Sequence, residues 1–200
     1  MDKNLSKNDW LKAARLALLK GGVEAVRVEK LARSLRVTKG SFYWHFKDRD
    51  ELLDLLLREW EGEMAEIIPR LGRRSVRETL LTLVRILVER ARLSEEGDAP
   101  SDAAIFAWAT VSPEVAQRVN RSEQERIKLL TRISGQPDRI GLLYLAWLGF
   151  VARAQRVPGL RKRFPQIARM MLKLLLRPEL KGKRRGPRQR QLGGASKPLR

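Results

Sequence analysis

Apolar side chains recur at intervals of three and four residues along most of the chain, which is the spacing of amphipathic helices. The first apolar stripe consists of Trp10, Ala13, Ala14, Ala17 and Leu18. It follows a capping box at residues 6–9 and stops at the glycine pair 21–22, so it predicts one complete helix. Two shorter helices are expected next, over Val28–Leu35 and from Thr38 through Phe46.

Helix-start signals divide the rest of the chain into six further helices. They are expected from Asp48 to a stop at Pro69, from Ser75 to about Leu93, from Asp102 to Thr110, from Ser112 to about Ile133, from Pro137 to about Ala154, and from Pro165 to about Arg177. The polar segment 94–101 is expected to be a loop. No stretch alternates strictly between apolar and polar positions, so the pattern predicts an all-α fold of about nine helices.

Charge is concentrated at the two ends of the chain. The 200 residues include 42 Lys and Arg against 23 Asp and Glu, a formal net charge of +19. Residues 1–49 carry a net charge of +7, and residues 177–200 carry +8. Such clustering is typical of a surface that binds a polyanion, most often nucleic acid.

The segment 178–200 is poor in apolar residues and rich in Gly, Pro and Arg, so we expect a disordered basic tail. Two interpretations of its charge stay open: a solvated flexible end, and a non-specific anchor on DNA. Attachment to a membrane surface is disfavoured, because the tail has no apolar face.

Several chemistries lack the residues that they need. The chain has no Cys and one His, His45, so thiol catalysis, Cys-based zinc sites and motifs that need two histidines are excluded, and no metal or cofactor is expected. There is no phosphate-binding loop, no glycine-rich dinucleotide motif and no catalytic pair of carboxylates, so an enzyme is not expected. Without a signal peptide or an apolar segment of membrane-spanning length, we expect a cytoplasmic protein with no membrane partner.

Five aromatic rings in a row, at residues 42–46, mark the second of two short helices separated by a tight turn, as in a helix-turn-helix. At about 100° per residue, Phe42 and Phe46 share one face while Trp44 points nearly opposite. A small helix cannot bury all five rings. Exposed rings with polar tips and neighbouring lysines suit a DNA phosphate backbone. The alternative is a buried aromatic cluster that packs against another helix.

Residues 8–61 resemble the N-terminal domain of the tetracycline-repressor (TetR) family of bacterial transcription regulators. The likeness is strongest over VTKGSFYWHFKDRDELL, residues 37–53, which is close to a family signature. The resemblance implies an all-α homodimer with a three-helix DNA-binding head and a larger helical body. It divides this chain into a helix-turn-helix DNA-binding domain (1–49), a ligand-binding and dimerisation domain (50–177) and the basic tail (178–200).

Matching the signature position by position implies a set of DNA contacts. The first turn of the recognition helix corresponds to Thr38, Lys39, Gly40 and Ser41, and the phosphate-contact positions correspond to Tyr43, Trp44, His45 and Lys47. Lys39 and Ser41 are the candidates for contacts to base edges, and the small size of Gly40 and Ser41 lets that turn approach the bases closely. For His45 the alternative is an ordinary surface residue.

Two positions depart from the family pattern. Arg36 stands in the turn where family members usually have Gly, so a left-handed backbone there costs about 1 kcal/mol relative to Gly. Arg27 stands where many members have a capping Ser or Thr, so the second helix is expected to lack that cap. Neither departure removes the motif.

The body contains aromatic and apolar residues that are candidates for the lining of a ligand pocket. They are Trp60, Met64, Phe106, Trp108, Tyr144 and Trp147. Each is also an ordinary core residue in the alternative interpretation, and the pattern identifies no ligand.

The last two long helices are the candidate dimer interface. Gly141, Leu145 and Gly149 lie on one helix face, and small residues at this spacing permit close helix approach. The apolar run 170–176 is expected beside them. A buried core helix in a monomer is the alternative.

Together these features predict a ligand-responsive DNA-binding transcriptional regulator, with a homodimeric repressor of a near-palindromic double-stranded operator favoured. Its effector would be a small molecule of unknown identity. An activator and a regulator without an effector stay open. The alternative function is that of a non-specific basic nucleic-acid-binding or packaging protein. An excess of bulk DNA would abolish the binding of such a protein to any one sequence.

Overall fold

The computed structural model describes residues 5–71, 74–157 and 159–176. Within these ranges the chain forms nine α-helices and no strand, which confirms the predicted all-α fold. The helices are α1 (Lys7–Gly21), α2 (Val28–Leu35), α3 (Lys39–Tyr43), α4 (Arg49–Leu71), α5 (Val76–Glu96), α6 (Asp102–Ala109), α7 (Pro113–Ser134), α8 (Pro137–Ala154) and α9 (Phe164–Leu175). Short 3-10 turns, η1 (Val23–Ala25) and η2 (Arg161–Arg163), precede α2 and α9. The predicted tail, 178–200, lies outside the described residues.

Most helix starts agree with the capping signals in the sequence. Ser6 and Ser75 each form a complete capping box with the acidic residue three positions on. The hydroxyl of Ser112 accepts a hydrogen bond from the N–H of Val115, with proline at the first position of α7. These bonds satisfy N–H groups that a helix leaves without intrahelical partners.

Three helix ends differ from expectation. Pro69 does not stop α4, which continues to Leu71, because Leu71 is fully buried and its packing holds the last turn. Helix α5 extends into the first part of the expected loop and ends at Glu96, followed by Gly97 in a left-handed conformation. Helix α3 ends at Tyr43 rather than Phe46, although the N–H of Phe46 still donates to the carbonyl of residue 42 (3.1 Å).

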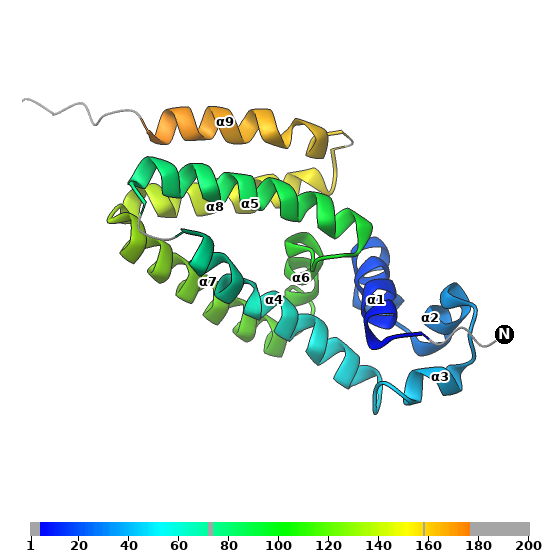
Figure 1. Ribbon diagram of the computed structural model, residues 1–200. Coiled ribbons are helices and arrows are strands. Elements are labelled where there is room, and N and C mark those ends of the chain that lie inside the picture. The colour runs from blue at the N-terminus through cyan, green and yellow to red at the C-terminus, as the bar shows by residue number, and fades with distance from the viewer. Residues whose placement is uncertain (1–4, 72–73, 158, 177–200) are drawn as a thin grey trace, which may run out of the picture.

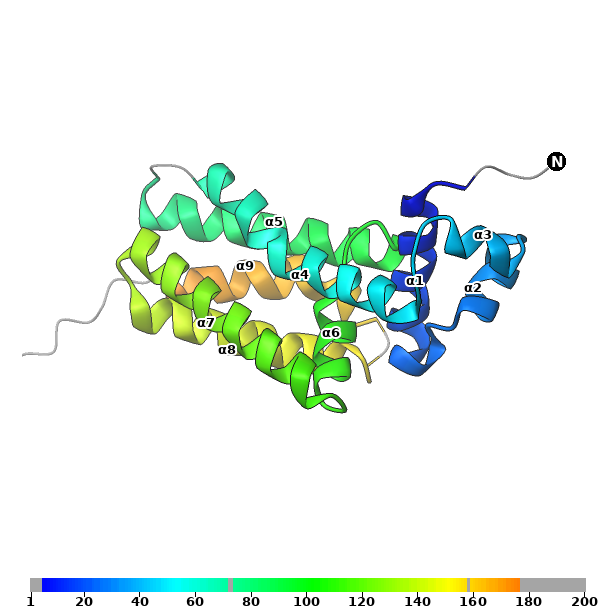
Figure 2. The same ribbon diagram turned by 90° about the horizontal axis from the view of Figure 1, so that it is seen from below.

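Helices α1–α3 form a head at one end of the molecule, and α4–α9 form an elongated body (Figure 1). Helix α4 leaves the head and runs into the body beside α7, while α6 packs on α7 and lies near α1 in both views (Figure 2). No helix in the described ranges is both long and apolar enough to cross a membrane.

The described residues form two hydrophobic cores, and their division does not follow the division into head and body. The first core joins the head to the first half of α4, to α6 and to the start of α7. The second joins the far end of α4 to α5, α8, α9 and the second half of α7. The expected domain boundary between residues 49 and 50 stays a prediction. The change from one core to the other occurs midway along α4 and α7.

Candidate DNA-binding site and the charged cluster of the body

The recognition helix holds two aromatic rings inside the head and presents two others to solvent. Phe42 and Phe46 are buried and stack with centroids 5.1 Å apart, and Trp10 of α1 lies edge-on to Phe42 at 5.2 Å. In contrast, Trp44 is 88% exposed and Tyr43 is 60% exposed. The expected orientation of these rings is confirmed, and the alternative of a wholly buried aromatic cluster is wrong.

The other candidate DNA contacts surround these two rings on the outer surface of the head. Thr38, Lys39, Gly40 and Lys47 are exposed, while Ser41 and His45 are half-buried. The Lys39 ammonium lies 3.1 Å from the Glu29 carboxylate on α2. The pKa of Glu29 falls below its usual range, because its own backbone N–H and then Lys39 interact with the carboxylate. An exposed pair of this kind is weak, so a DNA acceptor can replace Glu29 as the partner of Lys39.

The corner between α3 and α4 is fastened by charged side chains that bond to the backbone. The N–H of Lys47 donates to Glu51 (2.6 Å). The Arg49 guanidinium donates to two carbonyl oxygens of the segment 23–26, at 2.6 and 2.8 Å. These bonds hold α3 against the rest of the head.

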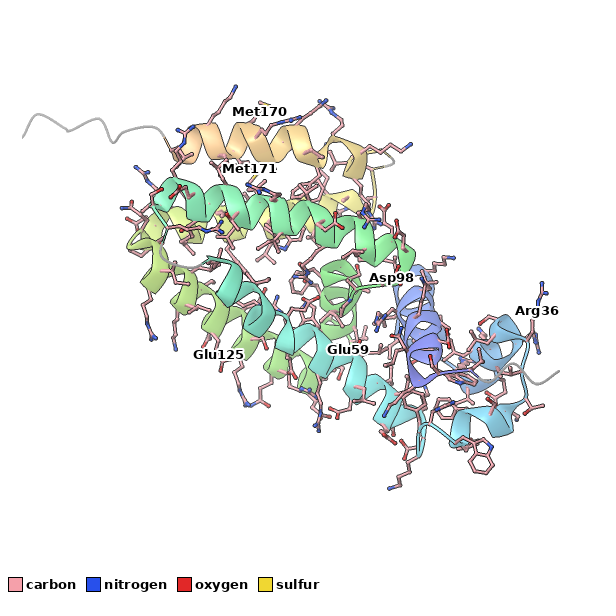
Figure 3. All side chains as sticks on the ribbon, viewed as in Figure 1. Arg36, Glu59, Asp98, Glu125, Met170 and Met171 are labelled. Atoms are coloured by element: carbon pink, nitrogen blue, oxygen red, sulfur yellow. The ribbon has the colours of Figure 1, made fainter. Side chains whose placement is uncertain are left out.

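The two departures from the family pattern behave as expected. Arg36 has a left-handed backbone (φ 59°), and its side chain extends into solvent at the outer end of the head (Figure 3). Arg27 begins α2 without a side-chain cap. Thr38, where the third helix was expected to begin, gives α3 no side-chain cap either: its hydroxyl makes no bond to the start of α3, and only its backbone carbonyl accepts from Ser41 (3.2 Å).

Packing within the head does not require glycine at position 40. A Cβ atom built there meets only the Thr38 hydroxyl at 3.6 Å, an ordinary contact, and the backbone is helical. The absence of a side chain therefore leaves an open backbone surface at the start of the recognition helix. Such a surface suits close approach to a ligand such as DNA.

In the body, a charged cluster lies where the two hydrophobic cores meet. It consists of Glu63 on α4, Arg90 on α5, Asp102 at the start of α6 and Arg126 on α7. The Asp102 carboxylate accepts from the indole N–H of Trp60 (2.6 Å) on one oxygen. Arg90 lies 3.3 Å and Arg126 4.0 Å from that same oxygen. The cluster thus connects four helices by charge rather than by apolar packing.

The two carboxyl groups of the cluster differ in charge state. Burial by itself raises the pKa of Asp102, but Arg90, Arg126 and the bonded indoles outweigh burial and hold it below its usual range. Burial raises the pKa of Glu63 to about 8, reinforced by the neighbouring Asp102 anion, and its contact with Arg90 does not offset this. At neutral pH Asp102 is therefore ionised and Glu63 is mostly protonated.

A small cavity of about 60 Å³ lies beside this cluster. Three charged residues line it together with apolar side chains and two rings: Arg90, Asp102, Arg126, Ile67, Leu83, Ile86, Leu87, Leu130, Ile140, Leu143, Tyr144 and Trp147. The Tyr144 hydroxyl donates to Glu123 (2.8 Å), and the Trp147 indole donates to Asp102 (2.9 Å). Burial and the bond to Glu123 raise the pKa of Tyr144.

The structure brings two of the predicted pocket residues to this cavity, Tyr144 and Trp147. Trp60 is fully buried behind Asp102 and packs edge-on against Phe106 (6.0 Å). Trp108 is buried in the core shared with the head. The side chain of Met64 lies outside the described part of the chain.

The four charged residues of the cluster were not predicted from the sequence. A signal was present, because each arginine interrupts an apolar stripe. Arg126 takes the place of an apolar residue between Val119 and Leu130, and Arg90 follows Leu83 and Leu87 at helical spacing. A charge on the inner face of a helix indicates a buried partner.

The head has the architecture and the exposed chemistry of a helix-turn-helix DNA-binding domain. Residues 11–56, which include most of the head and the start of α4, match the family model described as bacterial regulatory proteins, tetR family. The match confirms, for this segment of the chain, the resemblance to the TetR family found in the sequence. It implies a DNA-binding transcriptional regulator. Comparison with curated proteins and with solved structures gives no match.

Proposed function

We propose that this protein is a homodimeric repressor that binds a near-palindromic operator and releases it when a small molecule binds the body. The observation that carries the DNA-binding part is the outward presentation of Tyr43 and Trp44 beside Lys39 and Lys47, on a helix whose other face is buried. Lys39 and Ser41 are the proposed readers of base edges. Tyr43, Trp44, His45 and Lys47 are the proposed phosphate contacts.

An unpartnered apolar face on α8 and α9 supports the homodimer. Leu142 and Leu145 on α8 and Met170 on α9 are large apolar side chains that are at least half exposed. Nothing lies within 4 Å of a Cβ atom built at Gly141 or Gly149, so α8 has room for close helix approach. Figure 3 places Met170 on the side of α9 that faces away from the body. A second copy of this surface would cover it and set two heads on successive major grooves.

Contacts between the head and the segment that leads from α5 to the charged cluster support a response to a ligand. The carbonyl of Gly97, just after α5, accepts from Arg15 of α1 (2.6 Å), and Asp98 pairs with Lys12 (2.7 Å). Five residues after Gly97 the chain reaches Asp102, at the cavity. A ligand that displaces Asp102 would shift these contacts to α1 and favour a dimer whose heads are wrongly spaced.

The junction between Gly97 and α1 is closely packed, so a small displacement of Gly97 would also displace α1. A Cβ atom at Gly97 would lie 2.7 Å from the Leu16 side chain and 3.1 Å from a backbone oxygen of α1, and φ there is +77°. Arg15 also pairs with Glu59 of α4 (3.1 Å). Figure 3 shows Glu59 and Asp98 at the junction between α1 and the body.

Selection of bound sequences from random duplex DNA tests the DNA-binding part. We expect a two-fold symmetric consensus with half-sites about one helical turn apart. Binding that bulk DNA competes away without any consensus would favour the alternative, a non-specific packaging protein. A reporter gene placed behind the selected site distinguishes repression from activation.

Sedimentation of two charge variants tests the dimer. Leu145→Glu places a carboxylate on the proposed interface and should give a monomer with weakened operator binding. Val111→Glu is the matched control, since Val111 is 70% exposed and Leu145 66% exposed, but Val111 lies between α6 and α7. A Leu145→Glu variant that sediments like the parent protein would contradict this interface.

A further inference from the structure

Two buried guanidinium groups carry N–H groups that the protein leaves unused. The Nε atoms of Arg90 and Arg126 are inaccessible to solvent and have no hydrogen-bond partner among the described residues. Arg126 as a whole is only 6% exposed. Both arginines line the 60 Å³ cavity. A buried donor without an acceptor is unfavourable, so both atoms would gain from an acceptor placed in the cavity.

Terminal nitrogens of both arginines already make contacts within the protein. One terminal nitrogen of Arg126 donates to the carbonyl of Trp60 (2.6 Å), and its guanidinium lies over the Trp60 ring at 4.0 Å. A terminal nitrogen of Arg90 contacts both Glu63 and Asp102. These contacts fix the two side chains in place, which leaves the Nε–H groups as the free part of a built site.

The internal carboxylates do not saturate the site. Asp102 already accepts from Trp60 and Trp147 as well as from Arg90. Because burial raises the pKa of Glu63 to about 8, Asp102 is the main anion opposite two cations at neutral pH. The cluster therefore retains positive charge, and the rest of the cavity wall is chiefly aliphatic.

We propose that the effector is an apolar organic acid, whose carboxylate binds the Nε–H groups of Arg90 and Arg126 and whose apolar part lies among the leucines and isoleucines of the cavity. This inference rests on the proposed function, because it specifies the ligand that the body binds. Guanidinium donors and a carboxylate acceptor form strong, charge-assisted hydrogen bonds, and the aliphatic lining excludes a molecule that is polar throughout.

The space for such a molecule comes from two neighbouring cavities. A second cavity of about 50 Å³ shares Arg90, Asp102 and Trp147 with the first, and these three residues separate the two. Even together the two cavities are far smaller than a typical ligand site of about 300–1,000 Å³. Binding thus requires Trp147 and Asp102 to move, and Asp102 is the residue that connects the cavity to the segment contacting α1.

The experiment compares matched probes on the full-length protein without DNA. The probes are butanoate, octanoate, dodecanoate and benzoate, together with octanol and octylamine as analogues of octanoate that lack the carboxylate. Binding is measured by calorimetry below the micelle concentration of each probe. We expect at least one acid to bind at least about tenfold more tightly than the alcohol and amine. Equal binding of alcohol or amine, or no binding by any acid, would overturn the proposal.

A pair of variants locates the bound acid. Arg126→Met should weaken binding of the acid at least about tenfold while leaving octanol unaffected. Arg121→Met, an exposed arginine on the same helix, should change neither. Loss of acid binding in Arg121→Met, or full retention in a folded Arg126→Met, would place the acid elsewhere. If Arg126→Met does not fold, the comparison of probes on the parent protein still tests whether the site binds an organic acid.

Operator release is measured separately, so that the two proposals can fail separately. Acid binding without release of the selected operator would uphold the organic-acid site and refute the ligand-responsive part of the proposed function. Release of the operator by octylamine or octanol as effectively as by octanoate would uphold a ligand response and refute the organic acid.

Discussion

The head and the body use the same residue types in opposite ways. In the head, Tyr43 and Trp44 face solvent, and the Lys39–Glu29 pair is exposed. In the body, Trp60 is fully buried and donates to Asp102, an ionised group buried between two arginines. Polar groups of the head are thus exposed and accessible to a binding partner, whereas those of the body mostly form hydrogen bonds and ion pairs within the protein.

Because of this contrast, substitutions in the head and in the body should differ in how they affect folding stability and binding. An exposed polar group that lacks a protein partner costs little, because water satisfies it. A buried one costs free energy for as long as it stays unsatisfied. The exposed groups of the head can therefore be changed with little effect on folding. Changes in the charged cluster should alter folding first, and the following predictions test this difference.

The largest effect is expected where a buried anion is neutralised. Asp102→Asn leaves Arg90 and Arg126 without their shared carboxylate and should lower the free energy of unfolding by about 3–5 kcal/mol, measured by urea titration. Asp98→Asn breaks an exposed pair with Lys12 and should cost less than about 1 kcal/mol. Similar losses in the two variants would contradict the contrast between buried and exposed pairs.

A second effect concerns Glu63 and depends on pH. Its pKa is raised from 4.5 to about 8 on folding, so the folded state binds this proton more tightly than the unfolded state. The contribution to stability is therefore complete below pH 4.5 and is lost as the pH rises towards 8.

Glu63→Gln should remove this loss. The variant should be nearly as stable as the parent at low pH, and at pH 8 more stable by an amount on the order of 4 kcal/mol. The measurement is the free energy of unfolding at a series of pH values. A variant whose stability falls with pH as steeply as that of the parent would show that Glu63 is ionised in the fold.

The two tyrosines of the chain offer a direct exchange between the regions. Tyr43→Phe removes an exposed hydroxyl and should weaken DNA binding by about 1 kcal/mol on all sequences alike, without a change in stability. Tyr144→Phe removes the bond to Glu123 and should lower stability by about 1 kcal/mol without weakening DNA binding. Unchanged DNA affinity in Tyr43→Phe would remove Tyr43 from the set of contacts.

The last comparison concerns two helical glycines, where a small gain in stability is expected. Gly40→Ala and Gly62→Ala each place a methyl group where no close contact exists, so each should stabilise its helix by about 0.5–1 kcal/mol. Only Gly40→Ala should weaken operator binding, at least about tenfold, because its methyl group faces the proposed DNA surface. Gly62, on α4, is the control. Undiminished operator binding by Gly40→Ala would show that the backbone there does not approach DNA closely.

Local signals in the sequence were sufficient for the helices and for the head. Serine caps, glycine stops and the three-to-four-residue spacing depend on neighbours within one or two turns, and the capping boxes at Ser6 and Ser75 formed as predicted. The exposure of Trp44 followed from geometry alone, because Phe42 and Phe46 occupy the only buried face of a short helix. The predicted helix ends were wrong where a contact distant in sequence determines the end of the helix. An example is Pro69, beyond which burial of Leu71 extends α4.

The charged cluster shows what the sequence did not determine. Glu63, Arg90, Asp102 and Arg126 come from four helices, and Asp102 was predicted only as a helix start. The sequence by itself determined the all-α fold, the recognition helix and the outward face of its aromatic rings, because these depend on periodicity and short-range bonds. Only the tertiary structure decided which charges are buried together, because helix packing sets which inner faces meet and which donors are left without an acceptor.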